Sequence, residues 1–201
     1  MSGQLSVGDF VRVAKMADEL EISHTPVREA LSALRAEGVL ELEPNRGFRV
    51  APHQPAEDVA DMFLVQAFVG GELAARAAKL LTDTELGELR TLCDEFDAAA
   101  KDSNPELERL NRAFHDTIND GADSPALSRF YSSTVPIARR FYNLVPGWTQ
   151  LSIHDHRAIL AVLELRDPEL ARERMAAHME GISRLVIATL NDSEPAIDIS
   201  D

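Results

Sequence analysis

The sequence contains a single cysteine, Cys93, so no disulfide bond can form within the chain. Folding without disulfides is typical of proteins from a reducing compartment, and we expect this protein in the cytoplasm. Aromatic residues make up only 5% of the sequence, and no apolar run approaches the roughly 20 residues that span a membrane. The N-terminus also lacks the signal-peptide pattern, in which basic residues precede an apolar run. These absences argue against a membrane protein and against a secreted one.

Positive charge is scarce too. The sequence has 20 Lys and Arg residues and 34 Asp and Glu residues, which give a formal net charge of −14. This balance argues against a broad affinity for nucleic acid. The acidic excess is uneven, since residues 1–52 are close to neutral and the rest of the chain carries most of it. Any contact with DNA must therefore come from locally placed cations near the N-terminus.

Residues 23–38 read SHTPVREALSALRAEG and predict a helix with two different faces. Pro26 suits the first helical turn, and Gly38 ends the helix. One stripe is apolar: Val27, Leu31 and Leu34. Another face offers hydrogen-bond donors: His24, Arg28, Ser32 and Arg35. Such a helix suits the major groove of DNA, and the alternative is an ordinary amphipathic surface helix.

The residues around this helix predict a helix-turn-helix followed by a β-hairpin. Residues 13–20 form a short amphipathic helix, which a tight link at 21–23 joins to the next one. Apolar side chains then alternate through residues 40–43 and 47–50, which predicts a hairpin with Arg46 at its tip. This is the layout of a winged helix-turn-helix, in which a cation at the wing tip reaches phosphate or the minor groove.

Beyond a proline-containing linker, the sequence predicts only helices, several of them opened by a capping residue and a proline. The expected helices span residues 56–81, 82–101, 104–119, 124–145, 148–166 and 167–190. Gly70 and Gly71 inside the first of them indicate a close approach between helices. We therefore expect a mainly α protein with three parts: a winged helix-turn-helix at 1–52, an all-helical antiparallel bundle at 53–190 and a disordered acidic tail at 191–201.

Three of the six histidines lie on inward stripes of different expected helices: His115, His156 and His178. Asn111 precedes the first of them by four residues and shares its face. Three imidazoles and an amide oxygen suit a first-row divalent ion and leave positions open for water or a ligand. We expect zinc, with nickel or manganese as other candidates. The alternative is three core histidines, each hydrogen-bonded to a neighbour.

No catalytic arrangement accompanies these histidines. The pattern places no inward Asp or Glu beside them, and the sequence has no nucleophile signature and no glycine-rich phosphate loop. Cys93 is expected on the surface side of its helix, as an unremarkable thiol. We therefore predict a protein that binds ligands and is not an enzyme.

Two groups of motifs together resemble a known family. The segment SHTPVREALSALRAEGVLELEPNRGFRVAP resembles the winged helix of GntR-family bacterial transcription regulators. Three short motifs resemble the FCD effector domain of the FadR subfamily: AFH at 113–115, HRAIL at 156–160 and MAAH at 175–178. The resemblance extends from about residue 5 to residue 190.

The resemblance implies a homodimer that binds a pseudo-palindromic operator. A small effector, often a carboxylate metabolite, would bind in the helical domain and alter DNA binding. The implied DNA contacts are His24, Thr25, Arg28, Ser32, Arg46 and Gly47. The implied metal ligands are Asn111, His115, His156 and His178. Two of these positions depart from the family pattern, since His24 replaces a usual arginine and Asn111 replaces an aspartate.

The effector site departs from the family as well. Many relatives place an arginine and a glutamate on the first bundle helix, where this chain has Gln66 and Gly70. Gln66 would face the cavity as a neutral donor. Arg139, Arg140 and Tyr142 are further candidates, although a solvated helix face is the alternative for at least one of these arginines.

The family's first winged-helix helix is expected to be missing or shortened, because residues 1–4 cannot form it. Either the true start lies upstream of Met1 or this domain is compromised. The shortened start and the acidic charge support a rival interpretation. The protein would then be a metal-dependent enzyme or a metabolite sensor with a vestigial DNA-binding half.

Overall fold

The computed structural model describes residues 5–36, 38–44, 46–52, 55–100, 106–142 and 145–193. In residues 36, 136–142 and 191–193 the description covers the backbone alone. The chain divides into two compact units, Met1–Pro55 and Ala56–Asp201, and each is described by itself.

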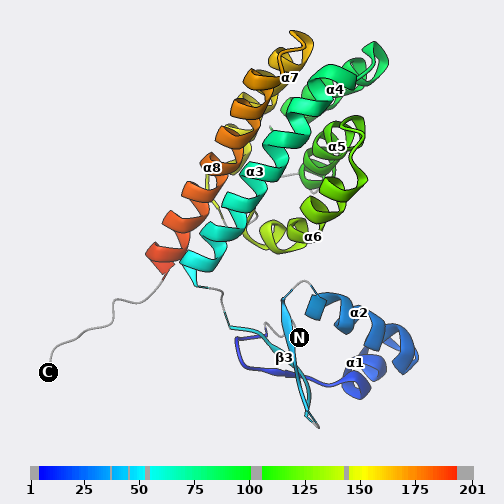
Figure 1. Ribbon diagram of the computed structural model, residues 1–201. Coiled ribbons are helices and arrows are strands. Elements are labelled where there is room, and N and C mark those ends of the chain that lie inside the picture. Colours follow the sequence, from blue (N-terminus) through cyan, green and yellow to red (C-terminus); the bar gives the residue numbers. More distant parts are fainter. Residues whose placement is uncertain are drawn as a thin grey trace, which may run out of the picture. The chain divides into compact units, whose positions relative to one another are not determined.

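The first unit combines two helices with a three-stranded antiparallel sheet (Figure 1). Its elements are β1 (Phe10–Val11), α1 (Val13–Leu20), α2 (His24–Ala36), β2 (Leu40–Glu43) and β3 (Gly47–Val50). The strand order is β1-β3-β2, and the β2–β3 hairpin pairs Leu40 with Val50 and Glu43 with Gly47. The predicted winged helix-turn-helix is confirmed. Strand β1 was not predicted, because two residues are too short to show a period.

A small apolar core joins the helices of this unit to its sheet. It consists of Val11, Ala17, Val27, Leu31, Leu40 and Phe48. The predicted stripe of α2 is therefore only partly buried, since Leu34 is 37% exposed and lies outside this core. The stripe ends one turn earlier than the sequence indicated.

The second unit is all helical, as predicted. Its helices are α3 (Ala56–Leu80), α4 (Asp83–Ala99), α5 (Glu106–Gly121), α6 (Pro125–Tyr142), α7 (Trp148–Glu164) and α8 (Pro168–Ser193). Helix α3 is central, because it contacts α5, α6, α7 and α8, and it lies alongside α8 (Figure 1). Helix α8 extends three residues into the segment expected to be a tail, and residues 194–201 lie outside the described part. Among the described helices, none is long and apolar enough to cross a membrane.

The helix starts follow from local chemistry in the sequence. Before α4, the Thr82 hydroxyl accepts a hydrogen bond from the Glu85 backbone N–H at 3.2 Å, and the Glu85 carboxylate accepts one from the Thr82 N–H at 2.7 Å. This reciprocal pair is a capping box. Before α8, the Asp167 carboxylate accepts from the backbone N–H groups of Glu169 and Leu170 at 3.0 and 3.1 Å. These side chains thus satisfy some of the backbone donors that the first turn of each helix leaves unpaired.

The position of Cys93 corrects an expectation. Its side chain is 1% exposed and belongs to the apolar core, whereas the sequence indicated a surface position. Helix α4 contacts both α5 and α7, so it has two covered faces instead of one. Burial raises the pKa of the Cys93 thiol to about 11, which keeps it protonated and unreactive near neutral pH.

The paired glycines of α3 mark a close helix approach, as predicted. A Cβ atom at Gly71 would lie 3.1 Å from the backbone oxygen of Arg172 on α8. A Cβ atom at Gly70 would lie 3.1 Å from the ring of Tyr131 on α6. Helix α8 can therefore pack tightly on α3 only while residue 71 has no side chain.

We expect Gly71→Ala to lower the free energy of unfolding by about 1–3 kcal/mol, because a backbone oxygen cannot move aside as a side chain can. Gly87→Ala is the matched control, since nothing lies within 4 Å of a Cβ added at this helical position. It should raise stability by about 1 kcal/mol through helix propensity. Urea denaturation followed by circular dichroism measures both, and equal gains in the two variants would contradict the close contact.

Candidate metal centre and DNA-binding surface

Three helices bring three histidine side chains together inside the helical unit. His115 comes from α5, His156 from α7 and His178 from α8, and each pair of rings has its centroids 5.2–5.4 Å apart. One ligand nitrogen from each residue lies within 4.8 Å of the other two. The three side chains are 8%, 1% and 2% exposed, respectively. Three helix stripes that the sequence singled out separately therefore converge on one point.

His156 is held by aromatic packing and carries an unsatisfied nitrogen. Its ring stacks on Phe114 with a centroid distance of 4.2 Å, and Phe96 lies 5.3 Å away. Its buried Nε2 has no hydrogen-bond partner. Leaving a buried polar atom unpaired costs about 1–3 kcal/mol, so a site that retains such an atom is suited to an additional ligand. This orphaned nitrogen is the observation that best fits a metal ion.

Burial favours the neutral form of two imidazoles in the cluster, those of His115 and His156. Burial lowers the pKa of His115 to about 3, with a smaller contribution from His178. Burial also lowers the pKa of His156 well below its usual value, and both neighbouring histidines add to the effect. A neutral imidazole keeps a free lone pair, which is the form that binds a metal ion.

Asp155 is a member of the site that the sequence did not reveal. Its carboxylate lies 3.1 Å from Nδ1 of His178, although we expected no acidic side chain beside the histidines. Asp155 directly precedes His156, so helix geometry turns it away from the stripe of that residue. A carboxylate that accepts the Nδ1 proton leaves Nε2 of His178 available as a ligand atom. The sequence did not reveal Asp155 because the residue pattern of α7 alone gives no information about α8, which packs beside it.

Asn111 is 8% exposed, and together with His115 it lines a small pocket of about 30 Å³. A cavity needs roughly 10–15 Å³ of such space to hold one water molecule. The remaining lining residues are Glu108, Arg112, Asp116, Tyr131 and Val135. The pocket can hold an ion or a water molecule beside the predicted amide ligand.

The candidate effector residues fall into two groups. Gln66 on α3 is 1% exposed and donates a hydrogen bond from Nε2 to the hydroxyl of Thr134 at 3.0 Å, while its Oε1 has no partner. Arg139, Arg140 and Tyr142 belong to the last turns of α6, but their side chains lie outside the described part of the structure. Gln66 thus offers a buried acceptor as well as the donor that we expected.

In the first unit, the donors predicted on α2 all face solvent. These exposed residues are His24, Thr25, Arg28, Ser32 and Arg35. Val27 and Leu31, on the opposite face, are 3% and 5% exposed. Helix α2 therefore presents a polar face to solvent, while its apolar face packs in the core of the first unit.

In the β2–β3 hairpin, which forms the wing of the winged helix-turn-helix, the arginines lie beside carboxylates. Arg46 is exposed near the hairpin tip, 3.1 Å from a carboxylate oxygen of Glu43, and its guanidinium lies 4.4 Å from the ring centroid of Phe10. Gly47 follows with a positive φ of 99°, a conformation that favours glycine at this turn.

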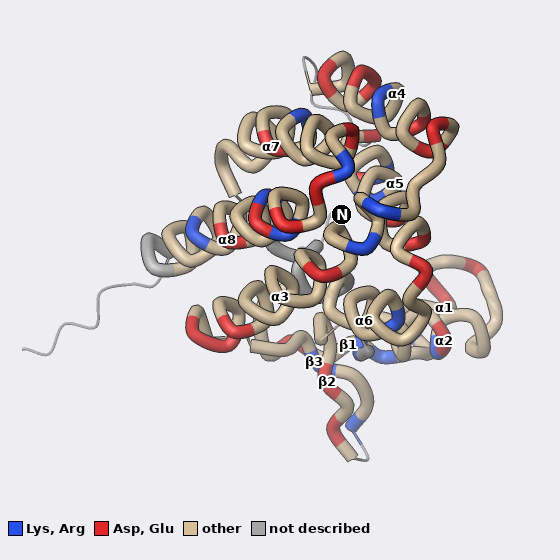
Figure 2. The backbone as a smooth tube through the Cα atoms, turned by 45° about the horizontal axis from the view of Figure 1, so that its top comes forward, with Lys and Arg blue, Asp and Glu red and all other residues tan. Residues whose placement is uncertain are grey.

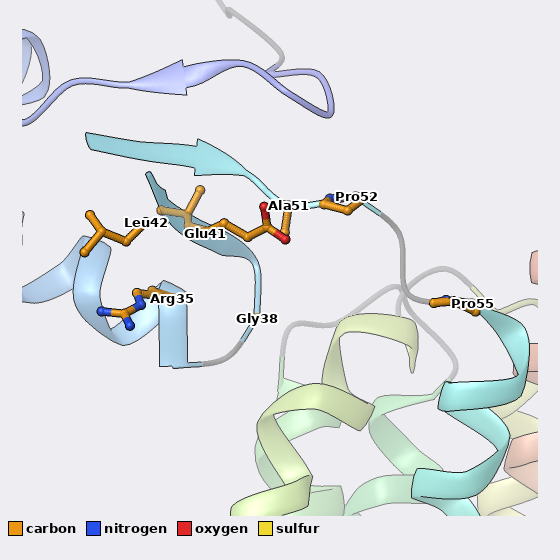
Figure 3. Close-up of a pocket in the computed structure, with 8 residues that line it drawn as sticks. Arg35, Gly38, Glu41, Leu42, Ala51, Pro52 and Pro55 are labelled. Carbon is orange, nitrogen blue, oxygen red and sulfur yellow. The ribbon is translucent and has the colours of Figure 1, made fainter. Parts of the chain in front are cut away.

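An open pocket of about 570 Å³ lies nearby (Figure 3), and none of the residues predicted to bind DNA or effector lines it. Its lining is Arg35, Gly38, Leu40, Glu41, Leu42, Ala51, Pro52 and Pro55.

Comparison with known families agrees with this architecture. Residues 1–50 match the bacterial regulatory proteins of the gntR family, and residues 61–181 match the FCD domain. The chain belongs to the GntR family of transcriptional regulators. Members of this kind are DNA-binding regulators and not enzymes.

Several relatives resemble this GntR-family regulator over different lengths. The Nta operon transcriptional regulator of Aminobacter aminovorans is 32% identical over 108 residues, which is 54% of this chain and 51% of that protein. A probable D-xylose utilization operon transcriptional repressor of Paenarthrobacter nicotinovorans is 28% identical over 181 residues, covering 88% and 79%. The solved structure of E. coli McbR/YncC has a TM-score of 0.75 at 23% identity and covers 93% of this chain and 91% of that one. At this identity the structural likeness shows the fold.

The buried histidines predict a pH-dependent stability. The unfolded chain protonates imidazole near pH 6.5, whereas folded His115 does so only near pH 3, so the unfolded state binds more protons between these values. Without metal, the free energy of unfolding should rise with pH across this window. The slope should reach about 1.4 kcal/mol per pH unit for each of His115 and His156, whose pKa values burial lowers, and the profile should level off above about pH 7.

Urea titrations followed by fluorescence of Trp148, the single tryptophan, measure this slope in the helical unit. His156→Phe should reduce the slope, because it removes one buried imidazole. His154→Gln should leave the slope unchanged, since His154 is exposed on the same helix. A flat profile in the wild-type protein between about pH 4.5 and 6.5 would contradict neutral burial.

Proposed function

We propose that this GntR-family regulator binds a pseudo-palindromic operator as a homodimer and senses a small organic acid at a metal-containing site in its helical domain. The observation that carries the proposal is the histidine cluster, in which ligand nitrogens from three helices lie within 4.8 Å of one another. As domains we propose a winged helix-turn-helix at 1–52 and an effector-binding and dimerisation domain from residue 53 to the end of α8 at Ser193, with the acidic residues after it as a tail.

The metal ligands in this proposal are His115, His156, His178 and the side-chain oxygen of Asn111. We favour zinc, with nickel or manganese as alternatives. A bound divalent cation would supply a positive centre that can hold a carboxylate. The four donors are neutral, so none of them offsets that charge, which favours an anionic ligand. Asp155 would fix the orientation of the His178 ring from outside the donor set.

The effector would contact the helical domain near this centre. Gln66 has an unpartnered buried oxygen and therefore suits a ligand that carries a hydrogen-bond donor in addition to its carboxylate. Arg139, Arg140 and Tyr142 are the other candidates for effector contacts. We propose that effector binding changes the spacing of the two winged units in the dimer, with a coupling free energy of about 1–3 kcal/mol.

The proposed DNA contacts are His24, Thr25, Arg28 and Ser32 on α2, with Arg46 and Gly47 on the wing. Arg28 is the first choice for a base edge, because its side chain is exposed on the polar face of α2. Arg46 is the choice for the wing contact. The rival proposal, a metabolite sensor with a vestigial DNA-binding half, predicts no salt-dependent DNA binding.

Purified protein should bind zinc, and each of His115→Ala, His156→Ala and His178→Ala should lose it. Asp155→Asn should weaken zinc binding by about 10–100-fold, because the His178 ring loses its outer hydrogen bond. Asn111→Asp should strengthen it, since a carboxylate replaces a neutral donor. Competition with a chromophoric chelator measures all five variants.

The matched control for the metal measurement is Asp94→Asn. Asp94 is 71% exposed on α4, where it pairs with Arg157, and it is not one of the proposed ligands. This variant should keep the zinc affinity of the wild type. If the wild type and the histidine variants hold equally little zinc, the three histidines are core residues and the metal proposal is wrong.

DNA binding is tested on a labelled duplex that the purified protein selects from a random-sequence pool. Its affinity should fall steeply with salt, because phosphate contacts release counterions. Arg28→Ala should weaken binding by about 1–3 kcal/mol, as expected for the loss of a base contact. Arg174→Ala, an exposed change in the helical unit, should have no effect. A flat salt dependence would favour the rival proposal.

A further inference from the structure

The charged side chains of the wing are paired with one another instead of facing DNA freely. We propose that Glu43 holds Arg46 in the free protein and must release it when DNA binds, so that Glu43 limits the affinity of the wing for phosphate. This inference rests on the proposed wing contact of Arg46. It concerns a residue on β2 that the predicted DNA contacts do not include.

Glu43 uses its two carboxylate oxygens for two different arginines. Oε2 lies 3.1 Å from Arg46, and Oε1 lies 3.1 Å from Arg49. Arg49 also contacts Glu41 at 3.0 Å. By sequence, the hairpin has two glutamates and two arginines, so its net charge is zero. Figure 2 shows these acidic and basic positions together on the hairpin.

Two features show that Arg46 is held before DNA arrives. Its guanidinium contacts Glu43 on one side and lies over the Phe10 ring on another, with 4.4 Å to the ring centroid. The Arg46 side chain is 65% exposed, whereas that of Glu43 is 25% exposed. The arginine is thus accessible to a phosphate, while its carboxylate partner is fixed in the hairpin by a second arginine.

The consequence for DNA binding follows from charge balance. A free arginine that reaches phosphate adds a favourable contact and releases counterions. An arginine that is already paired must leave its carboxylate to bind a DNA phosphate, so it only replaces one anion with another. The carboxylate that it leaves then lies near the phosphate and repels it. Both effects reduce the gain from the wing contact. They are modest, because the pair is exposed and salt screens it.

Glu43→Gln should tighten binding of the selected duplex by about 3–10-fold at low salt. The slope of the logarithm of the binding constant against the logarithm of the salt concentration should also become steeper, by about the amount expected for one more phosphate contact. The matched control is Glu41→Gln, which removes the same charge from the same strand but leaves the Arg46 pair intact. It should tighten binding less than twofold. Fluorescence anisotropy across a salt series measures both variants, and circular dichroism checks that each remains folded.

Two further variants separate release of Arg46 from a general change in charge. In an Arg46→Ala background, Glu43→Gln should tighten binding no more than Glu41→Gln does. Phe10→Leu keeps the net charge and removes the other contact of Arg46, so it should also tighten binding, by about twofold. This second route tests the inference even if Glu43→Gln does not fold.

The outcomes distinguish this inference from the proposed wing contact. If Arg46→Ala binds like the wild type, Arg46 does not contact DNA, and both the wing contact and the inference are wrong. If Arg46→Ala weakens binding but Glu43→Gln and Glu41→Gln have equal effects, the wing contact stands and the inference is overturned. A gain from Glu43→Gln that persists without Arg46 would also overturn it.

Discussion

The helical unit depends on keeping three imidazoles in contact inside a core from which water is nearly excluded. Burial lowers the pKa of His115 and His156, so both rings stay neutral without an acidic partner. Four helices share this task. Helices α5, α7 and α8 supply the rings, and α3 contacts all three of them. The capping box at Thr82 and the Asp167 cap satisfy helix ends around the same core, so the local and long-range interactions support one arrangement.

Most of the fold could be predicted because its signals are local. The capping residues, the prolines and the change of period after α2 each lie within a few residues of the boundary that they mark. Strand β1 could not be predicted, because its two residues become a strand only by pairing with β3. In the candidate site, the stripes of single helices brought out His115, His156 and His178. Asp155 and Cys93 depend on a second neighbouring helix, and a stripe carries no information about that neighbour.

The two units handle charge in different ways. In the helical unit, ion pairs such as Arg157 with Asp94 and Asp97 bridge neighbouring helices at the surface, while burial keeps His115 and His156 neutral in the interior. In the wing, the ion pairs lie on the surface that is proposed to meet phosphate. An acidic protein that binds DNA needs local cations. Here, the polar face of α2 offers Arg28, whereas the cations of the wing are already matched by Glu41 and Glu43.

The close contact at Gly71 has an evolutionary consequence for the histidine centre. Gly71 faces Arg172 on α8, and His178 follows six residues later on the same helix, about 9 Å along its axis. A homologue with a larger residue at this position would have to displace α8, and His178 would move with it. Substitution at a site with no polar group could therefore tune the histidine geometry from a distance. Among such proteins, differences in ligand response can therefore arise first from substitutions that change helix packing.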